Sequence, residues 1–101
     1  MGMGNLARMA QRMQADMARV DQELRDLTVE GSAGGGVVRA VVTGKQDIVS
    51  VTIDPGVVDP DDVEMLQDLI VAAVAEALAG ARRVGEEKLA RVTGGLQLPG
   101  F

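Results

Sequence analysis

The chain has 101 residues, enough for a single domain, and its formal net charge is −5. It contains no cysteine and no histidine, which excludes disulfides, thiolate metal sites, a cysteine nucleophile and the most common general base near neutral pH. Hydrophobic residues make up 47% of the chain, but Phe101 is the only aromatic one, so aliphatic side chains have to build the core.

The first 27 residues are expected to form one long helix, because apolar residues repeat there at heptad spacing. This seam consists of Met3, Leu6, Ala10, Met13, Met17, Val20, Leu24 and Leu27. A seam this narrow suits the packing of one helix against another, either within the chain or between two copies. The opposite side of the helix carries Arg8, Arg12 and Arg19, which fall within about 40° of one another at roughly 100° per residue.

A three-stranded antiparallel sheet is expected next. Residues Leu27 to Glu30 are a short strand candidate, followed by a glycine-rich loop over residues 31–36. The β-branched runs Val37 to Thr43 and Ile48 to Asp54 predict a hairpin that turns at residues 44–47. In the second run, valine or isoleucine alternates with polar residues at 49–53, which predicts one buried face and one polar face.

A second long helix is predicted to begin at Asp59, a good N-cap, with Pro60 in the first helical position. Gly80 and Gly85 each cost up to about 1 kcal/mol inside a helix, so a weak point or bend is expected there. The helix should end at Gly94-Gly95. The expected architecture is therefore an αβββα protomer of the α+β class over residues 1–95, with a flexible tail at residues 96–101.

Two clusters could be interpreted as ligand sites, and both have a simpler explanation. The glycines at residues 34–36 lack the Lys-Ser/Thr pair of a phosphate loop and lead into a strand rather than a helix. The second cluster is acidic and consists of Asp59, Asp61, Asp62 and Glu64. It lacks the ligand spacing of an EF-hand, and its negative charges interact favourably with the positive end of the helix dipole. No nucleophile–base set can be assembled, which predicts a protein that is not an enzyme and uses no metal, cofactor or small-molecule substrate.

The charge is unevenly distributed along the chain. Residues 1–15 and residues 80–101 each carry +2, whereas residues 59–79 carry −6. Basic ends of this kind are common as plain solvated surface, but two of them in one small domain suit the phosphates of a nucleic acid. The absence of stacking aromatics favours duplex over single strands. The candidate DNA contacts are Arg8, Arg12, Arg19, Arg82, Arg83, Lys88 and Arg91.

Location and assembly follow from length and hydropathy. No apolar run is long enough to cross a bilayer, and charged residues interrupt the N-terminus where a signal peptide would be apolar, so a cytoplasmic protein without membrane contact is expected. A small domain buries a modest fraction of its surface, and a homodimer would extend the core.

Four stretches in order along the chain form a specific combination. They are Gln11-Arg12-Met13-Gln14 with Gly4-Asn5, the strand segment Val49-Ser50-Val51-Thr52-Ile53-Asp54-Pro55, the helical segment Met65-Leu66-Gln67-Asp68-Leu69-Ile70, and the ending Thr93-Gly94-Gly95-Leu96-Gln97-Leu98-Pro99-Gly100-Phe101. Together with Gly36-Val37-Val38 and Gly44 they resemble the YbaB/EbfC family of nucleoid-associated proteins over essentially the whole chain.

The resemblance implies an αβββα protomer in a tweezer-shaped homodimer that coats or bends double-stranded DNA in the bacterial nucleoid. The helical arms would make the contacts, presenting here the seven basic residues given above. The chain departs from the family pattern in having few lysines near the N-terminus and in carrying Gly80 and Gly85 in the last helix. An alternative function is a DNA-independent dimeric scaffold whose methionine-rich seam binds a partner helix.

Overall fold

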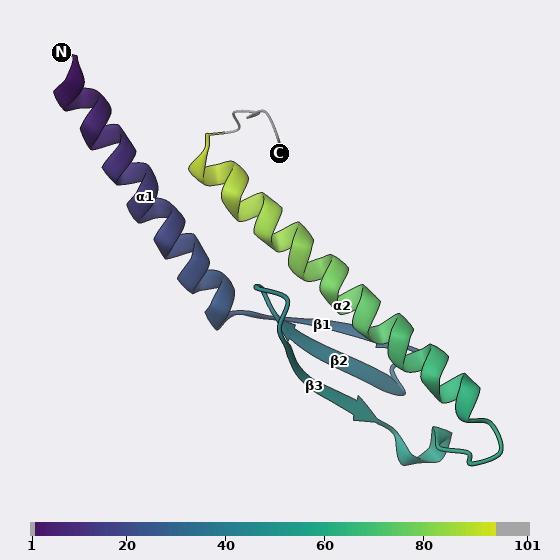
Figure 1. Ribbon diagram of the computed structural model, residues 1–101. Coiled ribbons are helices and arrows are strands. Elements are labelled where there is room, and N and C mark those ends of the chain that lie inside the picture. The colour runs from purple at the N-terminus through teal and green to yellow at the C-terminus, as the bar shows by residue number, and fades with distance from the viewer. Residues whose placement is uncertain (1, 95–101) are drawn as a thin grey trace.

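The computed structural model describes residues 2–94, and its elements follow the predicted αβββα order (Figure 1). They are helix α1 (Met3–Asp26), strands β1 (Thr28–Ala33), β2 (Val38–Thr43) and β3 (Ile48–Ile53), the 3-10 turn η1 (Pro55–Val57) and helix α2 (Val63–Val92). The sheet has the order β1-β2-β3 with both pairs antiparallel. The α+β class is therefore confirmed, and the expected tail at residues 96–101 lies outside the described residues.

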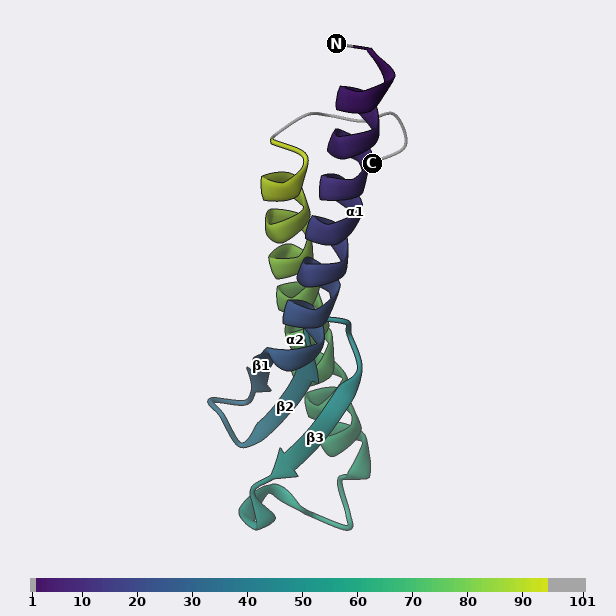
Figure 2. The same ribbon diagram turned by 90° about the vertical axis from the view of Figure 1, so that its left-hand side faces the viewer.

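The two helices form long arms that leave the sheet at the same end. α2 crosses one face of the sheet and continues beyond it, where its last turns run antiparallel to α1 (Figures 1 and 2). The Cα radius of gyration is 19.2 Å, whereas a compact domain of this length has about 13 Å. The protomer is thus elongated, with extents of 71 × 24 × 16 Å, and a large part of both arms is surface.

The core lies between α2 and the first two strands and is built from small side chains. Its fully buried members are Val38, Ala40 and Val42 on β2 and Ala73, Ala77 and Ala81 on α2. The three alanines are spaced by four residues and so form one stripe of the helix, against which a sheet can approach closely. Leu66 packs against this cluster while partly exposed.

β1 is longer than predicted, because Gly31 continues the strand instead of opening a loop. A Cβ on Gly31 would lie 2.3 Å from the backbone nitrogen of Ala77 and 2.4 Å from the carbonyl oxygen of Ala73. The glycine marks a close approach of the strand to the α2 backbone. The backbone N–H of Ser32 then donates a 2.8 Å hydrogen bond to Glu76 Oε2 on α2, and the chain turns at residues 34–36.

α2 begins three residues later than predicted and is uninterrupted. Asp62, not Asp59, is the N-cap, and its carboxylate accepts a 3.2 Å hydrogen bond from the N–H of Met65. Asp59 instead accepts from the N–H of Asp61 at 2.9 Å, so that it stabilises the turn before the helix. The helix passes through both of its internal glycines without a break. Gly80 is a site of close packing, because a Cβ there would lie 2.8 Å from Val29 Cγ1 of β1.

The expectation of a buried face on β3 was wrong for most of the strand. Ile53 packs against the core, but Ile48, Val49 and Val51 are 59%, 57% and 39% exposed. The reason is that α2 packs over β1 and β2 and leaves β3 uncovered. A bulge between Val41 and Val42 also shifts the register, so that Ile48 pairs with Val42. The protomer therefore presents an open apolar face along β3.

The heptad seam of α1 is covered only at its inner end. Val20 and Leu24 are buried, and Leu24 fits against Gly44, where a Cβ would lie 2.7 Å from the carbonyl oxygen of Leu24. The seam thus packs within the chain beside the sheet. Toward the tip, the apolar side chains of the same helix are 41% to 84% exposed; these are Met3, Leu6, Met9, Met13 and Met17.

Candidate nucleic-acid interface

The tip of α1 is a basic surface. Arg8 and Arg12 are exposed and one helical turn apart, on the side of the helix opposite the apolar seam. Within residues 2–94 neither arginine forms an ion pair. Asp16 is the first acidic residue of α1, so both guanidinium groups are available to an external anion.

A shallow hollow between the two arms brings together three of the predicted contacts. Its lining includes Arg19 of α1 and Lys88 and Arg91 of α2, together with two acids. Arg19 Nη2 lies 3.5 Å from Asp16 Oδ1, and Lys88 Nζ lies 3.0 Å from Glu23 Oε2. The charges of Arg19 and Lys88 are therefore engaged inside the protomer, while Arg91 has no ion-pair partner among the described residues.

The Lys88–Glu23 pair connects the two arms directly. Lys88 is the less exposed partner, with 24% of its side chain accessible against 44% for Glu23. The hydrogen bond from Lys88, together with its positive charge, lowers the pKa of the Glu23 carboxyl. Lys88 thus serves first to hold α2 against α1, and its share in any DNA contact is secondary to that role.

Arg82 and Arg83 lie nearer to the sheet, and both are exposed. As neighbours on a helix they point about 100° apart. Arg82 lines a second hollow, where it lies beside Lys45 and Gln46 of the β2–β3 turn. The segment from Arg82 to Arg91, which the sequence presents as one basic block, is therefore divided between the hairpin side and the α1 side of α2.

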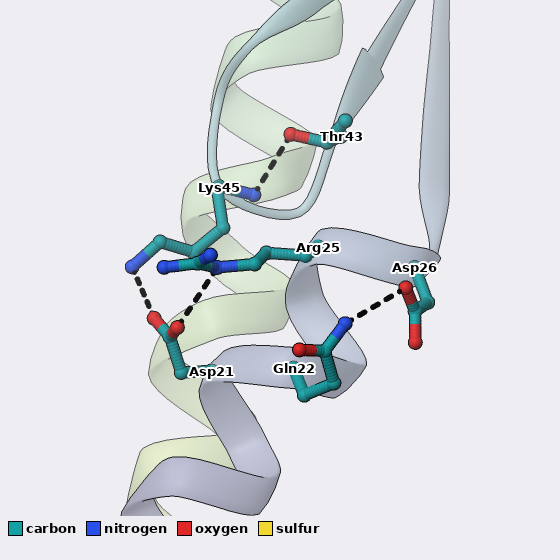
Figure 3. Close-up of polar contacts among 6 residues, drawn as sticks. All are labelled: Asp21, Gln22, Arg25, Asp26, Thr43 and Lys45. Atoms are coloured by element: carbon teal, nitrogen blue, oxygen red, sulfur yellow. Dashed lines mark hydrogen bonds and ion pairs between the residues drawn. The ribbon is translucent and has the colours of Figure 1, made fainter.

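Lys45 was not among the predicted contacts, and the fold places it beside them. Its Nζ lies 2.6 Å from Asp21 Oδ1, while Arg25 Nε lies 2.9 Å from Asp21 Oδ2 (Figure 3). The hydrogen bond from Lys45 lowers the pKa of Asp21, and Arg25 acts in the same direction. A basic residue in a predicted turn was the only sequence signal, since its proximity to α1 depends on the fold.

The acids before α2 lie at the far end of the molecule from the arm tips (Figure 1). Asp59 and Asp62 are occupied with backbone N–H groups, and among the described residues no group of three or more potential ligands is arranged to hold a metal ion. None of the helices in residues 2–94 is long and apolar enough to span a membrane. The acidic cluster before α2 is thus separated from the tip of α1, whereas the inner parts of the arms carry acids that pair with their own basic residues.

Comparison with known proteins covers nearly the whole chain. The family model described as the YbaB/EbfC DNA-binding family matches residues 1–96. A nucleoid-associated protein of Moorella thermoacetica is 53% identical over 104 residues and covers all of both chains. One of Acetivibrio thermocellus is 57% identical over 98 residues, with coverage of 96% of this chain and 87% of the relative. The crystal structure of an uncharacterized protein from Helicobacter pylori superposes with a TM-score of 0.78 at 20% identity, over 94% of this chain and 99% of that one, which supports the fold.

Proposed function

Because the chain belongs to the YbaB/EbfC DNA-binding family, a family of nucleoid-associated proteins rather than of enzymes, we propose that it binds double-stranded DNA as a homodimer. It does so through the two helical arms, with low sequence selectivity, in the nucleoid of the bacterial cytoplasm. The observation that carries the proposal is the pair of arginines at the tip of α1, Arg8 and Arg12, which form no ion pair within residues 2–94 and lie far from the acidic end of the molecule.

Phosphate contact is the chemistry that this surface supports. Arginine presents a fixed fork of donors that suits phosphate oxygens, and such contacts position a protein on a duplex without reading its bases. Arg82, Arg83 and Arg91 add guanidinium groups from α2 that likewise form no ion pair within residues 2–94. The contribution of Arg19 is smaller because it already has Asp16 as a neighbour at 3.5 Å.

The test is a titration of several unrelated duplexes at a series of salt concentrations. We expect similar affinities for all sequences and a steep decrease with salt, because phosphate contacts release condensed counterions. A single-stranded oligonucleotide of matched length is the control and should bind more weakly, since residues 2–94 contain no aromatic side chain on which bases could stack. Absence of binding to any duplex at low salt would refute the proposal and leave the DNA-independent scaffold as its successor.

Homodimerisation is supported by uncovered apolar surface. The accessible surface is 7230 Å² for a 10.5 kDa chain, whereas a compact monomer of this mass has about 5,400 Å². Part of this surface is apolar: Ile48 and Val51 are exposed on β3, and Val71 is 68% exposed on α2. Val71 lies on the side of α2 away from Glu76 and Gly80, which contact β1, and we infer that a partner protomer covers both apolar sites.

The variant Ile48→Asp/Val71→Asp should abolish the dimer. Two carboxylates on an apolar interface would be desolvated without partners, and the expected result in light scattering is a change from twice the chain mass to the chain mass. Met65→Asp is the matched control, since Met65 is 40% exposed on α2 in a separate hollow beside Asp62 and Asp68. A parent protein that is already monomeric at micromolar concentration would contradict the dimer.

A further inference from the structure

We propose that the outer part of α1 is a second self-association surface, which pairs with α1 of a copy from a neighbouring dimer. This surface, here called the arm seam, consists of Met3, Leu6, Ala10, Met13 and Met17. The proposal rests on the DNA-binding dimer proposed above and adds to it a contact between dimers.

The arm seam is an apolar surface that no other element of residues 2–94 covers. Leu6 is 64% exposed and Met13 is 41% exposed. The hollow between the arms contains both Asp16 and Val92, which shows that α2 ends beside the middle of α1. Residues 3–15 therefore project beyond the other described helices and strands, and an isolated helix shorter than about 12–15 residues is only marginally stable in water. Packing of the seam would stabilise this segment.

The charges around the arm seam favour another arm as the occupant. Within residues 3–15 the positions that flank the heptad seam are Ala7, Met9 and Gln14, none of which is charged, whereas Arg8 and Arg12 lie on the far side of the helix. Asp16, which flanks Met17, is the one charged flanking residue, and in an antiparallel pair centred on Ala10 it faces Gly4 of the other arm. Two arms can therefore meet without like charges across the interface. A phosphate has nothing to bind on this stripe, so that DNA and a second arm would occupy opposite sides of the same helix.

The centre of the arm seam suits an antiparallel pair. Ala10 is the smallest of its residues and lies midway between Met3 and Met17, so that in an antiparallel pair centred on it the two copies of Ala10 face one another and the helices can approach closely. In an antiparallel pair the two helix dipoles point in opposite directions, so that the positive end of each helix lies near the negative end of the other. Because the exposed β3 face lies at the other end of the protomer (Figure 1), the two surfaces would join dimers into an open chain.

DNA should promote this association. Two paired arms bring four arginines of the Arg8 and Arg12 type into one region, and bound phosphates neutralise their mutual repulsion. Binding to a long duplex is therefore expected to be cooperative, and binding to a duplex that accommodates a single dimer is not.

The first test uses the absence of cysteine from the chain, so that a single introduced cysteine can only link two chains. Ala10→Cys, oxidised mildly on a long duplex, should form a disulfide that gives species of at least twice the dimer mass in light scattering after the DNA is removed. Ala15→Cys, on the opposite side of the same arm, is the matched control and should remain unlinked. A linked Ala10→Cys protein that keeps the dimer mass, or no link at all, would overturn the proposal.

The second test removes the arm seam without a cross-link. Leu6→Gln/Met13→Gln changes two exposed side chains and should leave folding and the dimer intact. Its binding to a long duplex should lose cooperativity, and the protein concentration at half-saturation should rise several-fold. Its affinity for a duplex that accommodates a single dimer should not change. The control variant Ala15→Gln should bind both duplexes as the parent does. Unchanged cooperativity would refute the arm contact alone, whereas absence of duplex binding by the parent would refute the proposed function instead.

Discussion

Replacing Gly31 by alanine is expected to destabilise the protein by about 3 kcal/mol or more, at the upper end of the cost of overpacking. The added Cβ would lie 2.3 Å from the nitrogen and 2.9 Å from the Cα of Ala77. These are backbone atoms of a helix and cannot rotate away. α2 or β1 has to move, and either movement opens the contact between the alanine stripe and β2. Thermal unfolding at fixed protein concentration should show a melting temperature lower by roughly 10–20 °C.

Gly85→Ala is the matched control for this prediction. Its Cβ would meet only Leu24 Cδ1, at an ordinary distance of 3.9 Å, and alanine is the better helix former by about 0.5–1 kcal/mol. The melting temperature of this variant should therefore rise slightly. If the two variants melted alike, the close approach of β1 to α2 would be wrong.

The element order was predictable because each segment carries its own periodicity. The heptad of α1 and the alternating β-branched runs of β2 and β3 depend on local sequence alone, and the three structures have the expected type and nearly the expected bounds. Gly31 shows where prediction from the local sequence fails. A glycine before two small residues and three more glycines is typical of a loop, and only contact with Ala73 and Ala77, more than forty residues away, makes it part of a strand.

The second property that could not be predicted from the sequence is which apolar faces are buried within the protomer. The alternation at residues 49–53 predicts one buried apolar side of β3, but α2 does not cover that strand, and Val49 and Val51 remain 57% and 39% exposed. The seam of α1 is likewise continuous in sequence and divided in space, with Leu24 buried and Leu6 open. The spacing of apolar residues predicts that a helix or strand has an apolar face. Which part of the molecule covers that face depends on how far the neighbouring helix or strand extends.

The basic residues illustrate the same limit for the candidate site. Sequence identified seven cations and treated them as equivalent, but ion pairing separates them: Lys88 is bound to Glu23 and Arg19 lies beside Asp16, while Arg8 and Arg12 have no ion-pair partner among the described residues. Exposure and pairing together rank the proposed contacts, and this ranking makes the predicted effect on DNA binding specific to particular arginines.

The double variant Arg8→Gln/Arg12→Gln should weaken binding to every duplex by a similar factor. Each lost phosphate contact flattens the slope of log affinity against log salt by roughly 0.9, so the expected change for two contacts is roughly 1.8. Base selectivity should not change, because these contacts carry no sequence information. Folding and dimer mass should also persist, since both side chains are exposed and away from the apolar seam. Fluorescence titrations on a short duplex at four or more salt concentrations measure the slope directly.

Arg39→Gln provides the charge-matched control for the single substitutions. Arg39 lies on β2, where its Nη1 is 3.1 Å from Glu30 Oε1, and it belongs to the sheet rather than to the arms. Its removal lowers the positive charge of the protein by the same amount as Arg8→Gln but should leave the salt slope unaltered. Arg19→Gln should give a smaller change than Arg12→Gln, because Asp16 already neutralises part of the Arg19 charge. Equal effects of Arg39→Gln and Arg12→Gln would mean that net charge alone governs binding, and the arms would then have no special role in DNA contact.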